Sequence, residues 1–146
     1  SLPRIAASSI AVDFHHLNAE HLPFARDSFD TVVCTLTLCS IPDVVHALGE
    51  IHRVLKVGGR ALVLEFSTVR EPLLKPLYDF HSFSVLPRIG KLIAGDDASY
   101  RYLSESIRKH PDQSTLQAMM ETAGLSRVDV RNLSAGIVAI HRGYRV

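Results

Sequence analysis

Two hydrophobic patterns alternate along the chain, and together they predict an α/β fold. Residues 11–17 mix apolar, β-branched and histidine side chains, which predicts a half-buried strand. Residues 29–38 are almost continuously apolar and β-branched, which is typical of a strand buried on both faces. Between the two, Pro23 interrupts a polar stretch that predicts a loop or a short helical turn.

A helix is predicted after the second strand. Apolar residues recur at helical spacing over residues 44–55, Asp43 stands where a helix begins, and Gly58 and Gly59 stand where it would end. Residues 60–66, "RALVLEF", then predict another buried strand. The order strand, loop, strand, helix, strand is that of an open α/β sheet with crossover connections.

The second half of the chain combines an interrupted apolar segment with a helix and two strands. Prolines and glycines break up the apolar, aromatic residues 67–97, which favours a segment that covers the sheet over a sheet element. Residues 99–110 predict a helix that stops before Pro111, and residues 114–124 predict a helix closed by Gly124. Residues 126–133 and 136–144 alternate around a short turn, so we expect an antiparallel pair.

Composition narrows the class of protein. A chain of 146 residues with 47% hydrophobic and 21% charged residues fits one globular domain. Its net charge of +1 gives no field that would gather nucleic acid. Cys34 and Cys39 have neither a redox-motif spacing nor the number of a disulfide framework, which favours a reducing compartment. No apolar run approaches the ~18 residues of a membrane-spanning helix.

The ends of the predicted strands are the places to look for a ligand site, because ligands of open α/β sheets bind beyond the carboxyl ends of the strands. The side chain of Asn18 can donate and accept, which suits the edge of an adenine ring, although capping a turn is the commoner use of such a residue at this position. Glu65 ends the third predicted strand. We expect its carboxylate to anchor the adjacent loop by hydrogen bonds to backbone or to a hydroxyl, and only secondarily to touch a substrate.

Four stretches carry a resemblance to a known family. They are "NAEHLPFARDSFD", "HRVLKVGGRALVLEFS", "YRYLSESIRKHPDQSTLQAMMETAGL" and "NLSAGIVAIHRGYR". They resemble the UbiE/COQ5 family of S-adenosylmethionine-dependent C-methyltransferases of ubiquinone and menaquinone synthesis, and the second stretch fits the family signature from Arg53 to Ser67. The resemblance runs from about residue 11 to the end of the chain.

The resemblance implies a class I methyltransferase (Rossmann-like) sheet with strand order 3-2-1-4-5-7-6. The cofactor S-adenosylmethionine would lie across the strand ends, with the adenine-side pair of the family falling on Asn18 and Ala19 and its small hydroxyl residue on Thr35. Residues 67–111 would form an inserted segment that covers the quinol substrate. The candidate substrate contacts that the resemblance implies are Cys39, Ser40, Tyr78, His81, Arg88, Tyr100 and Arg101.

Two departures qualify this resemblance. The glycine-rich loop after the first strand of the family, and the acidic residue that grips the ribose after its second, have no counterpart in this sequence. The arginine and asparagine that the family usually shows after its fourth strand fall on Cys39 and Ser40, which cannot hold a quinol oxygen in the same way. A different small-molecule acceptor and an inactive truncated remnant therefore stay open as alternatives.

The same departures suggest a domain that lacks its N-terminal part. Without strands one and two of the family, residues 11–17 have no neighbour in the sheet, and residues 29–36 would expose an apolar edge. We expect that residues 11–17 must then dock directly against residues 29–36 if the chain folds alone.

Methyl transfer from a sulfonium to a ring carbon needs alignment, exclusion of water and a base that keeps the quinol oxygen anionic. His81, Tyr78 and Arg101 are the candidates for catalysis, with Tyr100 beside them, while packing roles remain alternatives. The histidines do not group as metal ligands would, so no metal site is predicted.

The resemblance also implies partners and a location. The expected partner is a prenylated quinol, and contact with a membrane surface, a homo-oligomer and a quinone-synthesis complex are further options. The expected location is the cytoplasm, at the periphery of the inner membrane, or the matrix side of that membrane in a mitochondrion.

Overall fold

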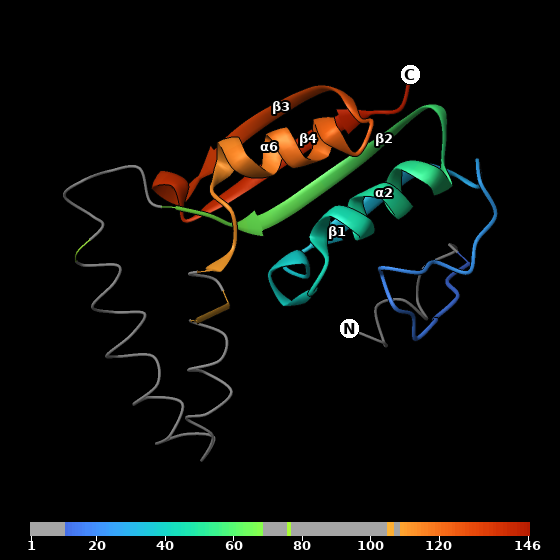
Figure 1. Ribbon diagram of the computed structural model, residues 1–146, viewed down its shortest axis with the longest axis horizontal. Coiled ribbons are helices and arrows are strands. Elements are labelled where there is room, and N and C mark those ends of the chain that lie inside the picture. Colours follow the sequence, from blue (N-terminus) through green and yellow to red (C-terminus); the bar gives the residue numbers. More distant parts are fainter. Residues whose placement is uncertain (1–10, 69–75, 77–104, 107–108) are drawn as a thin grey trace, which may run out of the picture.

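The computed structural model describes residues 11–68, 76, 105–106 and 109–146 (Figure 1). The N-terminal half of the described chain contains β1 (Phe29–Thr35), the short 3-10 helix η1 (Leu38–Ser40), α2 (Val44–Val54) and β2 (Leu55–Phe66). The C-terminal part contains α6 (Gln113–Thr122), β3 (Ser126–Leu133), the 3-10 turn η3 (Ser134–Gly136) and β4 (Val138–Tyr144). No helix of these residues is long and apolar enough to cross a bilayer.

The four described strands form one mixed sheet in the order β1-β2-β4-β3. β1 and β2 are parallel, and α2 forms the connection between them. β4 lies antiparallel between β2 and β3, with Val63 opposite His141. When β1, β2, β3 and β4 are taken as strands four to seven, this order equals the 4-5-7-6 half of the expected sheet, which confirms that part of the prediction.

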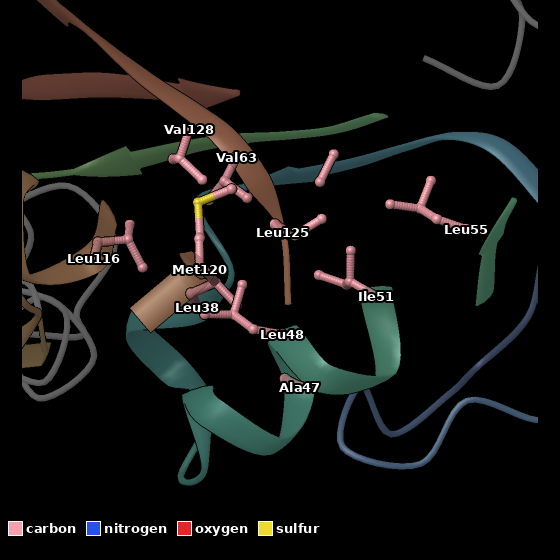
Figure 2. Packing of buried hydrophobic residues seen from close by; sticks show 11 residues of the cluster. Leu38, Ala47, Leu48, Ile51, Leu55, Val63, Leu116, Met120, Leu125 and Val128 are labelled. Carbon is pink, nitrogen blue, oxygen red and sulfur yellow. The ribbon is translucent and has the colours of Figure 1, made fainter. Parts of the chain in front are cut away.

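Both helices pack on the same face of the sheet (Figure 1). The thioether of Met120 on α6 points toward Val63 of β2 and Val128 of β3, while Leu48 and Ile51 of α2 lie below it (Figure 2). Apolar burial of this kind stabilises a domain by ~25 cal/mol per Å². The core of the described residues therefore lies on one side of the sheet. Its buried members are Leu38, Ala47, Leu48, Ile51, Leu55, Ala61, Val63, Leu116, Met120, Leu125 and Val128.

The helix boundaries follow from aspartate caps. Asp43 Oδ1 accepts the amide of His46 at 2.9 Å, and Asp112 Oδ1 accepts the amide of Thr115 at 2.8 Å, which satisfies amides that have no partner within the helix. Both helices were predicted near these positions. The predicted end of α2, at Gly58 and Gly59, was wrong, because the helix stops at Val54 and Leu55 already belongs to β2.

The two glycines of "VGG" lie inside β2 and do not end the helix. Gly58 has a φ of +82° and its amide donates to the carbonyl of Arg145 at 2.7 Å. The register of β1 against β2 jumps from the Phe29–Leu55 pair to the Thr31–Arg60 pair, so the glycines sit in an irregular stretch of the strand. Arg145 also donates to the carbonyls of His52 and Arg53 in the last turn of α2 and is nine-tenths buried, so its side chain caps this end of the helix.

The predicted strand at residues 11–17 is wrong. These residues are exposed and have no regular secondary structure, and among the described residues β1 pairs only with β2. Val12, Phe14 and Leu17 remain at the surface, so the expected docking of this segment against β1 does not occur. The reason is that a strand forms by pairing, and a local β-branched pattern supplies no partner by itself.

Candidate functional site

The carboxyl ends of the parallel strands β1 and β2 are joined by one buried carboxylate. Oε1 of Glu65, near the end of β2, accepts the backbone amide of Thr37 at 2.5 Å and that of Leu38 at 2.7 Å. The Glu65 side chain is fully buried. Charge-assisted bonds of this kind are the strong ones among protein hydrogen bonds. The predicted role of Glu65 as the anchor of the adjacent loop is therefore confirmed.

The turn that Glu65 holds is strained. Leu36, directly after β1, has a φ of +51° although its side chain is branched, and it is also 46% exposed. Thr37 Oγ1 donates to the carbonyl of Thr35 at 2.8 Å, which closes the turn from its other side. Strained backbone persists where surrounding bonds over-determine it, and it is frequent at functional sites.

Burial sets the charge state of this region. Burial is the largest influence on Glu65 and raises its pKa, against the two amides, which lower it. Burial and then the Glu65 carboxylate raise the pKa of Cys34 to about 11, and burial raises that of Cys39. Both thiols are therefore protonated at neutral pH, which makes neither a thiolate nucleophile.

Three predicted site residues gather around this turn. Thr35 ends β1 with an exposed side chain, Cys39 is half-buried on η1, and Ser40 follows it with its Oγ 3.9 Å from the Cys39 Sγ. The structure therefore places a hydroxyl, a neutral thiol and a second hydroxyl at the carboxyl end of β1. Such a group can donate and accept hydrogen bonds but brings no positive charge to a substrate.

Asn18 and Ala19 lie in the loop before β1, which is tied to the start of α2. Asn18 Oδ1 accepts the amide of Glu20 at 3.0 Å, which is an Asx turn, and Ala19 packs against the hydrophobic core. Glu20 Oε1 in turn accepts the amide of Asp43 at 2.8 Å, at the start of α2. The turn cap that the sequence offered for Asn18 is thus present. The exposed Nδ2 of Asn18 donates one hydrogen to Glu20 Oε2 at 3.5 Å, so its second hydrogen is the spare donor.

A partly buried ion pair between Arg53 and Glu50 fixes the loop that carries Asn18. Arg53 on α2 donates to the carbonyls of Leu22 and Phe24, each at 2.8 Å, and to Glu50 Oε1 at 2.6 Å. The hydrogen bond from Arg53 is the main reason that the pKa of Glu50 falls to about 2. Glu50 Oε2 accepts the amide of Leu22, so two side chains of α2 hold the loop by its backbone.

A second polar cluster surrounds the start of α6, and the sequence reasoning did not identify it. Gln113 is 2% exposed, and its Nε2 lies within hydrogen-bond distance of the carbonyls of Thr68 and Gly136 and of Asn132 Oδ1. His141 Nε2 lies 2.9 Å from the Gln113 carbonyl. Burial and the neighbouring His141 lower the pKa of His110 to about 4, and burial lowers that of His141. Two features of the sequence could have indicated this cluster: the polar run "HPDQ" at residues 110–113, and His141 within an otherwise apolar strand.

The remaining candidates fall outside the described residues. They are Tyr78, His81, Arg88, Tyr100 and Arg101. Within the described ranges, no three His, Cys, Asp or Glu side chains group as metal ligands would. The donors at Thr35 and Asn18 fit a neutral, hydrogen-bonding cofactor such as the adenosyl part of S-adenosylmethionine, because such a group needs mixed donors and acceptors.

Comparison with known proteins places the chain in a family. The family model of the "ubiE/COQ5 methyltransferase family" matches residues 4–145. A ubiquinone/menaquinone biosynthesis C-methyltransferase UbiE of Xylella fastidiosa strain 9a5c is 59% identical over 92% of this chain and 53% of its own length. That of Stenotrophomonas maltophilia strain K279a is 53% identical over 94% of this chain and 54% of its own. The chain thus spans about half the length of these relatives.

Solved structures agree on the fold. A Thermotoga maritima SAM-dependent methyltransferase, described as a possible histamine N-methyltransferase, superposes with a TM-score of 0.61 over 88% of this chain and 61% of its own, at 23% identity. The [4+2]-cyclase SpnF superposes with a TM-score of 0.66 over 99% of this chain and 59% of its own, at 17% identity. The sheet is therefore that of class I S-adenosylmethionine-dependent methyltransferases, and the chain belongs to the UbiE/COQ5 methyltransferase family.

Proposed function

We propose that this chain forms part of an S-adenosylmethionine-dependent C-methyltransferase that methylates a prenylated benzoquinol or naphthoquinol in ubiquinone or menaquinone synthesis. Two observations support the proposal: membership of the family, and 59% identity to a relative that bears this name. The observation that carries it in the structure is the Glu65 clamp, which fixes the carboxyl ends of β1 and β2 at the edge where ligands of such sheets bind.

The cofactor residues of the proposal are Asn18, Ala19 and Thr35. S-adenosylmethionine would supply an electrophilic methyl group, so the protein needs to align two partners and to exclude water. The Thr35 hydroxyl would hydrogen-bond the cofactor at the carboxyl end of β1, and the spare Asn18 amide would meet the adenine edge. These two contacts would form only part of the cofactor site.

The substrate residues of the proposal are Cys39 and Ser40, together with the candidates outside the described residues. A base that keeps the quinol oxygen anionic is needed for attack by the ring carbon. Cys39 does not meet this need, because burial raises the pKa of its thiol. The proposal therefore leaves the base among His81, Tyr78 and Arg101, with Arg88 and Tyr100 as further contacts to the quinol or its prenyl tail.

A methyltransferase with another small acceptor is the second candidate, and Cys39 and Ser40 favour it. Where the resemblance leads us to expect arginine and asparagine, this chain offers a neutral thiol and a hydroxyl. The fold is compatible with other chemistry, since a [4+2]-cyclase shares it at a TM-score of 0.66. An inactive remnant is the third candidate, and cofactor titration tests it.

Cofactor titration and product analysis test the proposal. Calorimetry should show saturable binding of S-adenosylmethionine that Thr35→Val weakens at least threefold, while Thr122→Val, on the exposed side of α6, leaves it unchanged. Label from the methyl group should appear on a ring carbon of demethylated prenyl quinols. The double variant Cys39→Arg, Ser40→Asn should raise quinol turnover.

Three results would overturn it. Label that enters only non-quinol acceptors would favour the second candidate, and a fall in quinol turnover in the double variant would argue against a quinol at Cys39 and Ser40. Absence of cofactor binding, both alone and with the remainder of the family domain supplied, would identify a remnant. Peripheral contact with an inner membrane belongs to the same proposal, and vesicle flotation with and without a prenyl quinol tests it.

A further inference from the structure

The buried side-chain atoms without a hydrogen-bond partner lie where β2 ends and α6 begins. Among the described residues they belong to Glu65 (Oε2), Ser67 (Oγ), His110 (Nδ1 and Nε2) and His141 (Nδ1). Almost all buried polar atoms of proteins have a partner, in the protein or in bound water. A group of unpartnered atoms at one place therefore points to a bound molecule that supplies the missing hydrogen bonds.

Gln113, the first residue of α6, connects the segments that carry these atoms. Its backbone carbonyl lies 2.9 Å from His141 Nε2 on β4. Its side-chain Nε2 donates at 3.0 Å to the carbonyl of Thr68, which directly follows Ser67. His110 precedes Gln113 by three residues, and the charge of His141 acts on its ring. The unpartnered atoms thus come from three segments that this glutamine joins.

Glu65 and His141 point to the same face of the sheet. The register pairs Val63 with His141 and Glu65 with Ala139, and all four residues are buried. Glu65 and His141 are therefore diagonal neighbours on two adjacent strands, and such neighbours lie about 7–8 Å apart, within reach of long side chains. Because the residue opposite Glu65 is only an alanine, the side chains of this corner are polar on one diagonal and small on the other.

Most of the unpartnered atoms are acceptors. A carbonyl oxygen only accepts, so the contact with Gln113 assigns the hydrogen of His141 to Nε2 and leaves a lone pair on Nδ1. Burial lowers the pKa of His141 and, together with His141, that of His110 to about 4, so both rings are neutral at pH 7. Neutral His110 offers one donor and one acceptor. A molecule at this place must therefore be able to donate hydrogen bonds.

Two classes of ligand do not suit this arrangement. An anion would meet the Glu65 carboxylate and the carbonyl oxygens of Thr68 and Gln113. A metal ion would need at least three grouped ligands, and the described ranges contain no such group of His, Cys, Asp or Glu side chains. A neutral hydroxyl group suits it, because it donates one hydrogen bond and accepts others.

We propose that the corner where β2 ends and α6 begins binds a neutral hydroxyl group, which donates to His141 Nδ1 and hydrogen-bonds the ring of His110. Two kinds of molecule carry such a group: a bound water, and a hydroxylated aromatic acceptor such as a quinol. The first source is independent of the proposed function, whereas the second rests on it. In both cases the hydroxyl group joins β4 to the segment that leads into α6.

Heteronuclear NMR of the chain with labelled histidines tests the site at pH 7. His141 should show the Nε2–H tautomer with a hydrogen-bonded Nδ1. Nuclear Overhauser contacts from a long-lived water to the rings of His110 and His141 would identify water as the source. Hydroquinone separates the two sources. If an acceptor hydroxyl binds here, hydroquinone should move the Nδ1 resonance saturably and displace any water contacts, and its dimethyl ether, which has no donor, should not. Water contacts that persist in its presence assign the site to water.

Variants at His110 provide the matched comparison. His110→Phe keeps a ring but removes both nitrogens, and it should reduce the hydroxyl contacts of His141 at least tenfold. His110→Gln keeps a donor and an acceptor and should retain them. His46→Phe, at an exposed position of α2, is the control and should behave like the wild type. An unchanged His141 Nε2–H resonance shows that each variant keeps the bond to Gln113.

Four results would overturn the proposal. They are a His141 hydrogen on Nδ1, an Nδ1 that accepts from a side chain of the protein itself, rings that contact neither a long-lived water nor hydroquinone, and a larger Nδ1 shift with formate than with hydroquinone. Full hydroxyl contacts in folded His110→Phe would exclude His110 from the site. A chain that transfers no methyl group but holds the water would contradict the proposed function alone, so the two failures are distinguishable.

Discussion

The Glu65 carboxylate of β2 accepts the backbone amide of Leu38 at 2.7 Å, so the end of one strand holds the turn that follows its parallel neighbour. The same oxygen takes the amide of Thr37. Two strands that are separated by a whole helix are thereby locked at their carboxyl ends. The geometry of the candidate site depends on this side chain even though the carboxylate is fully buried.

Replacing Glu65 by glutamine should lower stability more than it lowers any methyl transfer. The amide keeps the shape but loses the charge assistance of two hydrogen bonds, and it buries an NH2 group at the same place, for a loss of about 1–3 kcal/mol. Chemical denaturation measures the loss. Glu121→Gln, exposed on α6, is the control and should change stability by less than about 0.5 kcal/mol. A collapse in rate at an unchanged melting temperature would contradict the anchoring role.

Truncation of Gln113 should destabilise the domain through the groups it leaves behind. Gln113→Ala removes the donor shared by the carbonyls of Thr68 and Gly136 and by Asn132, at a cost of about 2 kcal/mol. Gln117→Ala, one turn later on α6 and only half-buried, serves as the comparison, and its loss should be well under half as large. Equal losses in urea denaturation would show that burial of the amide adds nothing.

Stability should fall in mild acid because of His110. A histidine whose pKa is about 4 in the folded state and about 6.5 unfolded binds fewer protons when folded. The contribution of neutral His110 to the free energy of unfolding is therefore intact above pH 6.5 and is lost as the pH falls toward 4. The loss is up to about 2 kcal/mol after allowance for partial exposure of the ring. His110→Phe should flatten the loss between pH 6.5 and 4.5 in thermal melts. An unchanged slope would exclude His110 as its source.

The loop that carries Asn18 should loosen when Arg53 becomes lysine. Lysine keeps the charge but cannot reach the carbonyls of Leu22 and Phe24 and the Glu50 carboxylate at once. Hydrogen exchange at the Leu22 amide should speed up at least tenfold. Arg142→Lys changes an exposed pair with Asp129 and should leave that amide unaffected. Slow exchange in the Arg53 variant would show that Glu50 alone holds the loop.

The strands β1 to β4 and the helices α2 and α6 could be predicted individually because their signals are local, whereas the order of the strands in the sheet came from the family resemblance. Asp43 and the periodic apolar residues after it mark α2, and the alternation around Ser134 marks the antiparallel pair of β3 and β4. The role of Glu65 was predictable as well, since a lone carboxylate at the end of an apolar strand needs donors nearby.

The failures share a physical cause, which is that they depend on partners distant in the sequence. Residues 11–17 have the composition of a strand but find no neighbour to pair with. Gly58 resembles a helix end, yet its amide meets the carbonyl of Arg145, at the other end of the chain. The cluster of His110, Gln113 and His141 likewise joins segments that are distant in the sequence, and no local pattern predicts that they come into contact.

One consequence of the bond between Gln113 Nε2 and the Thr68 carbonyl, at 3.0 Å, concerns how this family can change. Thr68 lies just after the end of β2 and Gln113 begins α6, and this hydrogen bond joins the two points. A segment whose ends meet in this way can be lengthened, shortened or exchanged between relatives with little effect on the sheet, because its loop-closure requirement is already met by the scaffold. Residues 69–112 can therefore differ in length or sequence among relatives while β2 and α6 keep their places.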